Sequence, residues 1–256
     1  MPLIEVPQAR LWYEDTGGDG TPVVFVHPAA ASSATWEHQL PAFVSAGYRC
    51  ITYDLRGWGK SRQPDPAADP GYLSDDLEAL TQALGLGPFL LVAAAYGGMG
   101  ALDYALRFQN RLRAFVLATS QGAIVDPEYA DIISRIVPPA LRAVPIELRE
   151  VGPSYRAENP AGVQRWLDIV HEAGGETATR QARFLKLTLE LLETLHVPTL
   201  VLAADADLLA PPSLMRQLAD RIPGSTFSTV PDAGHSAHWE RPEVWNRTVL
   251  EFLARH

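Results

Sequence analysis

Short apolar runs rich in β-branched residues alternate along the chain with longer segments in which apolar residues recur at helical spacing. Buried parallel strands carry such apolar runs because helices cover both faces of their sheet. We therefore predict an α/β fold with a doubly wound, mostly parallel sheet. The predicted strands are Val23–His27, Arg49–Tyr53, Phe89–Ala94, Ala114–Ala118, Pro198–Ala203 and Thr226–Pro231, with Arg10–Tyr13 as an antiparallel leader. The predicted helices are Thr35–Ala46, Tyr72–Leu84, Gly97–Arg107, Ser213–Arg221 and Pro242–Ala254.

The alternation of strands and helices breaks once, in residues 120–195, which contain several helical segments and no convincing buried strand. Prolines divide this region into short helices, because proline lacks a backbone N–H and disfavours a helix interior. We predict that residues 120–195 are a helical insert, and that residues 1–119 and 196–256 form the core domain. Within the insert, Trp166 and Ile169 recur at helical spacing, which favours packing onto the core over contact with a substrate.

The charge balance excludes two kinds of partner. The 256 residues include 21 Lys and Arg against 30 Asp and Glu, for a formal net charge of −9. Nucleic acids and anionic membranes select clustered Lys and Arg, so neither is expected as a partner. The N-terminus lacks a basic segment followed by an apolar one, and no apolar stretch is long enough to cross a membrane. We expect a cytoplasmic, soluble protein that binds a small-molecule substrate, and its oligomeric state is left open.

Metal and cofactor motifs are incomplete in this sequence. Cys50 is the only cysteine, which excludes internal disulfides and clusters of zinc-binding thiolates. The seven histidines are scattered, and none has the H-E-x-x-H spacing that brings two of them onto one helix face. The segment Gly59-Lys60-Ser61 ends like a phosphate-binding loop, but Asp54 occupies the position of its first glycine. We therefore expect no metal and no cofactor.

Segments suited to catalysis directly follow three of the predicted strands. In an open parallel sheet, the loops at the carboxyl ends of the strands converge on a crevice, where reactive groups collect. The small residues from Ala93 to Gly98 join the third strand to a helix, which predicts a tight turn with N–H groups free to stabilise an anion. Asp205 and Asp207 follow the fifth strand, and His235 follows the sixth. A carboxylate beside an imidazole is the arrangement that an oriented general base needs.

Together these segments resemble the α/β-hydrolase fold family, and the similarity runs along essentially the whole chain. Five features of that family have counterparts here in the same order. They are the strand with its His-Gly turn, the Asp-x-Arg-Gly-x-Gly-x-Ser segment, the nucleophile elbow, the acid and the base. The counterparts are, in that order, Val23–Pro28, Asp54–Ser61, Ala93–Gly98, Asp207 with Pro211, and Gly234-His235. The resemblance implies that Asp207 and His235 are the acid and base of a catalytic triad. It also implies that the insert is a cap, or lid, over the active site.

The resemblance assigns the attacking serine to position 95, but the residue there is Ala95. A methyl group cannot attack a carbonyl, so covalent catalysis through this position is excluded in this sequence. Three explanations stay open. A natural serine has been replaced by alanine to inactivate the enzyme, or the natural enzyme uses His235 with Asp207 as a general base, or the protein binds a ligand without catalysis. In each case the backbone N–H groups of Ala29 and Tyr96 remain as the expected oxyanion hole.

We expect a cofactor-independent α/β hydrolase that cleaves an ester, a lactone or a C–C bond of a small apolar carbonyl compound. The alternatives are a cofactor-free lyase, isomerase or oxygenase, which needs a base and an anion site but no nucleophile, and a non-catalytic ligand-binding homologue. Further candidates for the pocket are His27, His238, Trp239 and Trp166. The competing interpretations are that His27 stabilises a turn and that His238 and Trp239 pack at the start of a helix.

Overall fold

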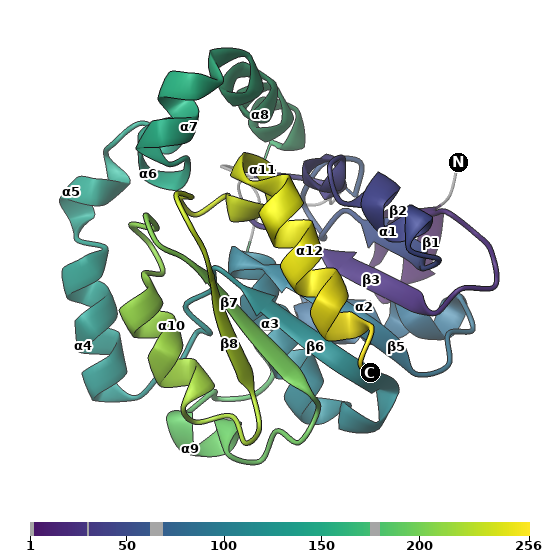
Figure 1. The fold of residues 1–256 in the computed structure, drawn as a ribbon. Coiled ribbons are helices and arrows are strands. Elements are labelled where there is room, and N and C mark those ends of the chain that lie inside the picture. Colours follow the sequence, from purple (N-terminus) through teal and green to yellow (C-terminus); the bar gives the residue numbers. More distant parts are fainter. Residues whose placement is uncertain (1–2, 30, 62–68, 175–179) are drawn as a thin grey trace.

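The computed structural model describes residues 3–29, 31–61, 69–174 and 180–256. Eight strands of these residues form one sheet in the order β1-β2-β4-β3-β5-β6-β7-β8 (Figure 1). The pairs β1–β2 and β2–β4 are antiparallel, and the other pairs are parallel. The prediction of a doubly wound, mostly parallel sheet is confirmed. The strands are β1 (Leu3–Val6), β2 (Ala9–Asp15), β3 (Pro22–Val26), β4 (Arg49–Tyr53), β5 (Phe89–Ala94), β6 (Leu112–Ala118), β7 (Thr199–Ala204) and β8 (Thr226–Val230).

Helices cover both faces of the sheet, which explains why its central strands are continuous apolar runs. Successive side chains of a strand point to opposite faces, so Val23 and Phe25 pack in one apolar cluster and Val24 and Val26 in another. The first cluster lies under α1 and α12, and the second lies under α2, α3 and α10 (Figure 1). These helices are α1 (Leu40–Ser45), α2 (Leu73–Ala83), α3 (Ala95–Arg107), α10 (Pro212–Ala219) and α12 (Pro242–Leu253).

The predicted helix Thr35–Ala46 is wrong, because this segment folds as a 3-10 helix, η1 (Ser33–Trp36), followed by a turn and α1. Pro41 stands in the first turn of α1, where a missing N–H costs nothing. Gln39 lies in the turn and is buried, and its Nε2 donates to the carbonyl of His238 at 2.8 Å. The break between η1 and α1 is therefore set by a contact with a residue far away in the sequence. The edge strand β1 was not predicted, since only one of its four residues is buried.

The insert consists of short helices, as predicted, and four of them begin at a proline. The described part of the insert contains no β-strand. Ala182 forms a single parallel β-bridge with Tyr72. The first five helices form an arch beyond one end of the sheet (Figure 1). The helices are α4 (Pro127–Ile136), α5 (Pro139–Arg142), α6 (Ile146–Glu150), α7 (Pro153–Glu158), α8 (Pro160–Ala173) and α9 (Leu189–Leu192).

Three features of the described residues concern membranes, metal ions and thiol reactivity. Within the ranges given above, no helix is both long and apolar enough to span a membrane. In the same ranges, no group of three or more His, Cys, Asp or Glu side chains could hold a metal ion. Cys50 is buried in β4, and burial raises the pKa of its thiol to about 12. This thiol is therefore protonated at neutral pH and is a poor nucleophile.

Candidate active site

The turn between β5 and α3 has the geometry of a nucleophile elbow, with Ala95 at its tip. Ala95 is the first residue of α3 and has a φ of +48°, in the left-handed region that alanine rarely adopts. A side chain at Gly97 would meet the carbonyl oxygen of His27, and one at Gly98 would lie 2.9 Å from Leu117 Cδ1. The hydroxyl of Ser120 donates to the Ala95 carbonyl at 2.7 Å. Close packing against neighbouring strand ends therefore holds the strained turn.

Asp207 and His235 lie at the ends of the adjacent strands β7 and β8, and they are hydrogen bonded. Nδ1 of His235 is 2.8 Å from Oδ2 and 3.0 Å from Oδ1 of Asp207. The Asp207 carboxylate also accepts the N–H groups of Leu209 at 2.8 Å and Ala210 at 3.0 Å. Asp205, the competing acid, is exposed and accepts the N–H of Ala233 at 3.4 Å. Asp207 is therefore the carboxylate that orients the imidazole.

The environment of His235 favours its protonated form. Burial by itself lowers the pKa of this imidazole, because it disfavours the charged form. The charge of Asp207 and its hydrogen bond act in the opposite direction, with smaller contributions from Glu150 and Glu240, so the pKa of His235 is raised overall. Burial also raises the pKa of the Glu150 carboxyl, against the opposing charges of His235 and Arg149. The imidazole is thus suited to accept a proton near neutral pH.

The loop that carries His235 is attached to the insert by backbone contacts. One oxygen of the Glu240 carboxylate accepts the N–H of Gly152 at 2.8 Å and the N–H of Gly234 at 2.9 Å. The N–H of Ser236 donates to the carbonyl of Glu150 at 2.9 Å. A side chain at Gly234 would lie 3.0 Å from the Cα of Gly152. The glycine before His235 therefore permits a close approach of two backbones.

The backbone N–H groups of Tyr96 and Ala29 were predicted to form an oxyanion hole, and both residues line one cavity. Tyr96 is the second residue of α3, so its N–H has no acceptor within its own helix. Ala29 follows the turn made by His27 and Pro28. Nδ1 of His27 is 2.8 Å from the Pro28 carbonyl, and Nε2 accepts the N–H of Leu55 at 2.9 Å. Burial lowers the pKa of His27, so a neutral imidazole stabilises this turn.

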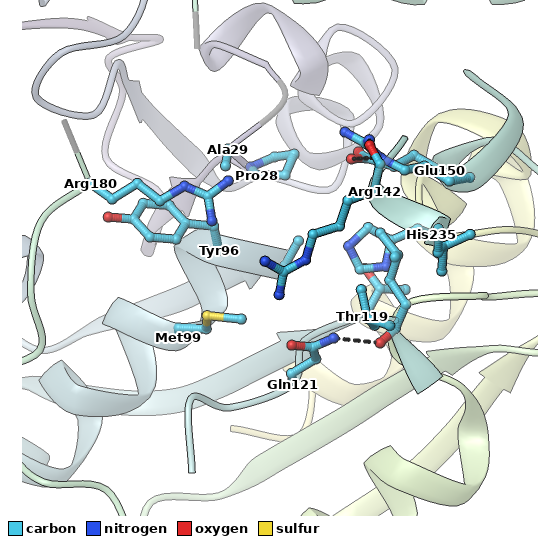
Figure 2. A pocket seen from close by; sticks show the side chains of 15 residues that line it. Pro28, Ala29, Tyr96, Met99, Thr119, Gln121, Arg142, Glu150, Arg180 and His235 are labelled. Atoms are coloured by element: carbon cyan, nitrogen blue, oxygen red, sulfur yellow. Dashed lines mark hydrogen bonds and ion pairs between the residues drawn. The ribbon is translucent and has the colours of Figure 1, made fainter. Parts of the chain in front are cut away.

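A cavity of about 580 Å³ lies where these strand ends meet the insert (Figure 2). Ala95, Tyr96, Ala29 and His235 all line it, and Asp207 lies behind His235. The core-derived lining is Pro28, Ala29, Ala95, Tyr96, Met99, Thr119, Leu209 and His235. The insert-derived lining is Gln121, Val137, Leu141, Arg142, Arg149, Glu150 and Arg180.

Four charged side chains of the insert-derived lining were missed by the sequence analysis, namely Arg142, Arg149, Glu150 and Arg180. Three of them lie on α5 and α6, which have four and five residues. Helices this short show no periodic face, so no pattern in the sequence indicated which side chains point inward. The available signal was the number of arginines in a segment predicted to form a cap.

Four residues considered for the pocket lie away from the cavity lining. His27 holds the turn described above. His238 is buried with Nε2 2.8 Å from Thr35 Oγ1, and burial lowers its pKa to about 3. Trp239 donates from Nε1 to the Gly162 carbonyl at 3.2 Å. Trp166 is buried in the same apolar cluster as Trp239. His238 thus joins η1 to α11 (Ala237–Glu240), and Trp166 and Trp239 join the insert to the core, so these three side chains have packing roles.

Comparison with known proteins gives the same family as the sequence motifs. A family model described as alpha/beta hydrolase fold matches residues 21–242. The 2-hydroxy-6-oxononadienedioate/2-hydroxy-6-oxononatrienedioate hydrolase of Burkholderia vietnamiensis is 28% identical, over 97% of this chain and 92% of that protein. The structure of a thermophilic esterase from Thermogutta terrifontis, with malate bound, has a TM-score of 0.81 and 29% identity, covering 99% of this chain and 97% of that one. A bromoperoxidase from Bacillus anthracis has a TM-score of 0.78 and 25% identity, covering 98% and 99%.

Proposed function

This chain belongs to the α/β-hydrolase fold family of enzymes, and we propose that it hydrolyses an ester, a lactone or a C–C bond of a small carbonyl compound by general-base catalysis. The observation that carries the proposal is that His235, hydrogen bonded to Asp207, lines the same cavity as the strained elbow at Ala95. Such strain persists where surrounding contacts enforce it, and it is typical of functional sites. The insert, residues 120–195, acts in this proposal as the cap of the active site.

In the proposed reaction His235 activates a water molecule, because Ala95 offers no nucleophile. Nδ1 of His235 is engaged by Asp207, so Nε2 is the nitrogen that accepts the proton of water. The water oxygen attacks the substrate carbonyl, and the N–H groups of Tyr96 and Ala29 stabilise the negative oxygen that forms. His235 then donates its proton to the leaving group, which restores the starting state.

A serine at position 95 would change this route without changing its other groups. Its hydroxyl would attack the carbonyl directly, with His235 accepting the hydroxyl proton and Asp207 holding the imidazole. The substitution Ala95→Ser therefore tests whether the elbow is built for a nucleophile. We expect a covalent acyl-enzyme, detectable by intact-protein mass spectrometry, from Ala95→Ser and none from the protein with Ala95.

The decisive test of the proposal is turnover of a panel of small esters, lactones and C–C substrates. We expect kcat/KM to fall on the order of 10²–10⁴-fold in His235→Ala, because that change removes the general base. The control is His196→Ala, which removes an exposed histidine that does not line the cavity. Ligand binding without turnover in the unsubstituted protein would contradict general-base catalysis and support a non-catalytic homologue.

A cofactor-free lyase, isomerase or oxygenase is the second candidate, and the alanine at position 95 favours it. Such reactions need a base and an anion site but no nucleophile. Glu150 lines the same cavity as His235 and supplies a second group able to transfer a proton. Product mass separates the two candidates, since hydrolysis adds the elements of water and an isomerisation or elimination does not.

A further inference from the structure

We propose that Arg142 and Arg180 form a subsite that binds a carboxylate group of the substrate, separate from the carbonyl that reacts. Both arginines line the cavity that contains Ala95, Tyr96 and His235. Figure 2 shows the guanidinium group of Arg142 extending into the cavity and that of Arg180 lying beside Tyr96. The proposal deepens the proposed function, because it specifies which carbonyl compounds the site accepts.

The three arginines of the cavity differ in what they contact. Arg149 is engaged within the insert, since its Nη1 donates to the Arg142 carbonyl at 2.9 Å and its Nε is 3.7 Å from Glu150 Oε1. Arg142 and Arg180 have no ion-pair partner in the part of the chain that the structure describes. The guanidinium carbon of Arg180 lies 5.5 Å from the centre of the Tyr96 ring. Among the residues that the structure describes, no acidic side chain neutralises these two guanidinium groups, so both can interact with a ligand.

The backbone that carries each of these arginines is anchored. Arg149 fixes the segment after α5 through the carbonyl of Arg142. The hydroxyl of Tyr96 donates to the carbonyl of Gln181 at 3.1 Å, and Nε2 of Gln181 donates to the buried carboxylate of Asp76 at 2.8 Å. Anchoring of the backbone reduces part of the entropy lost when a ligand binds, because the position from which each arginine side chain extends is held.

The charge of the cavity contrasts with that of the whole chain. The chain carries a net charge of −9, whereas its insert-derived lining contains three arginines and one glutamate. A cleft lined by one sign of charge concentrates ligands of the other sign. Guanidinium groups stay charged and present donors that match the two oxygens of a carboxylate. A carboxylate has about four acceptor sites, so it can accept from both arginines at once.

Isothermal titration calorimetry with matched acids and amides tests this subsite. The probe pairs are succinate with succinamide, glutarate with glutaramide, and benzoate with benzamide, at one ionic strength. We expect at least one acid to bind about tenfold more tightly than its amide, as hydrogen bonds to charged groups predict. Arg142→Gln and Arg180→Gln should each abolish this preference. The control is Arg135→Gln, which changes an exposed arginine of α4 outside the cavity lining.

Two results would overturn the proposal. One is equal binding of every acid and its amide, or an acid preference that survives both substitutions. The other is tighter binding of inorganic phosphate than of every carboxylate, which would reassign the subsite to phosphate. His235→Ala separates this proposal from the proposed function, because it should lower kcat/KM and keep the acid preference. Circular dichroism spectra of the variants verify that each one is folded.

Discussion

The reactive groups of the core-derived lining follow the ends of strands. The charged groups of the insert-derived lining lie on helices of four and five residues and at Arg180. Neighbouring backbone atoms at Gly97 and Gly234, and neighbouring side chains at Gly98, leave no room for a Cβ and so constrain the core-derived lining. The insert is attached near His235 by the Glu240 contacts with Gly152 and Gly234. In the proposed function the core-derived lining fixes where the reaction takes place, and the insert-derived lining supplies charges that act on the ligand and on His235.

The largest expected effect is on the core side. Asp207→Asn should lower kcat/KM on the order of 10²–10⁴-fold, because an amide can donate to Nδ1 and stabilise the wrong tautomer of His235. Steady-state kinetics on the substrate identified by the panel measure the effect. The matched control is Asp205→Asn, two residues away and exposed. A loss of similar size in the control would contradict the assignment of Asp207.

Adding one methyl group at Gly97 tests the close packing of the elbow. Gly97→Ala should lower the free energy of unfolding by about 1–3 kcal/mol, because the new Cβ would meet the carbonyl oxygen of His27. Urea denaturation measures the change. Gly87→Ala is the control, since a Cβ there has no neighbour within 4 Å. Equal stability of the two variants would show that the close approach at the elbow is not required.

The pH dependence of activity tests whether the two parts of the lining are coupled, because the charge of Glu150 in the insert raises the pKa of His235 in the core. The pKa of His235 is raised, so the basic form becomes dominant only above that pKa, and kcat/KM should rise with pH through a midpoint above about 6.5. Glu150→Gln removes one charge that raises this pKa and should move the midpoint to lower pH. The control is Glu147→Gln on the same helix. An unchanged midpoint in Glu150→Gln would exclude this coupling.

The raised pKa of His235 also makes the stability of the protein depend on pH. A protonated His235 stabilises the folded state, and this contribution is full below the pKa of the unfolded chain. It is lost as the pH rises through the higher pKa of the folded state. The stability difference between this protein and His235→Ala should therefore shrink as the pH rises through that range, as denaturation at several pH values can measure.

The smallest expected effect is on the surface of the insert. Arg135 and Asp131 form an ion pair one helical turn apart, with side chains 68% and 59% exposed. Solvent screens such pairs, so Arg135→Ala should change the free energy of unfolding by less than about 0.5 kcal/mol and leave kcat/KM unchanged. Urea denaturation and the activity assay measure both. A large change in activity would mean that α4 contributes to the site.

Much of the core-derived lining, and of the strands that carry it, could be predicted from the local sequence. The apolar runs around Phe89–Ala94 and Thr199–Ala204 indicated buried strands, and the residues after them indicated the elbow and Asp207. The preference for Asp207 over Asp205 came from the family spacing to Pro211. The break between η1 and α1 could not be predicted, because it depends on contacts of Gln39 with residues about 200 positions away.

The sequence by itself determined the fold class, the order of the elements and the absence of a nucleophile at Ala95, because each of these is encoded in local patterns or in the identity of one residue. Only the tertiary structure decided that Arg142, Glu150 and Arg180 line one cavity with His235, and that His238 does not. The physical reason is that short helices leave no periodic signal. The direction of their side chains is fixed by where the insert packs against the core.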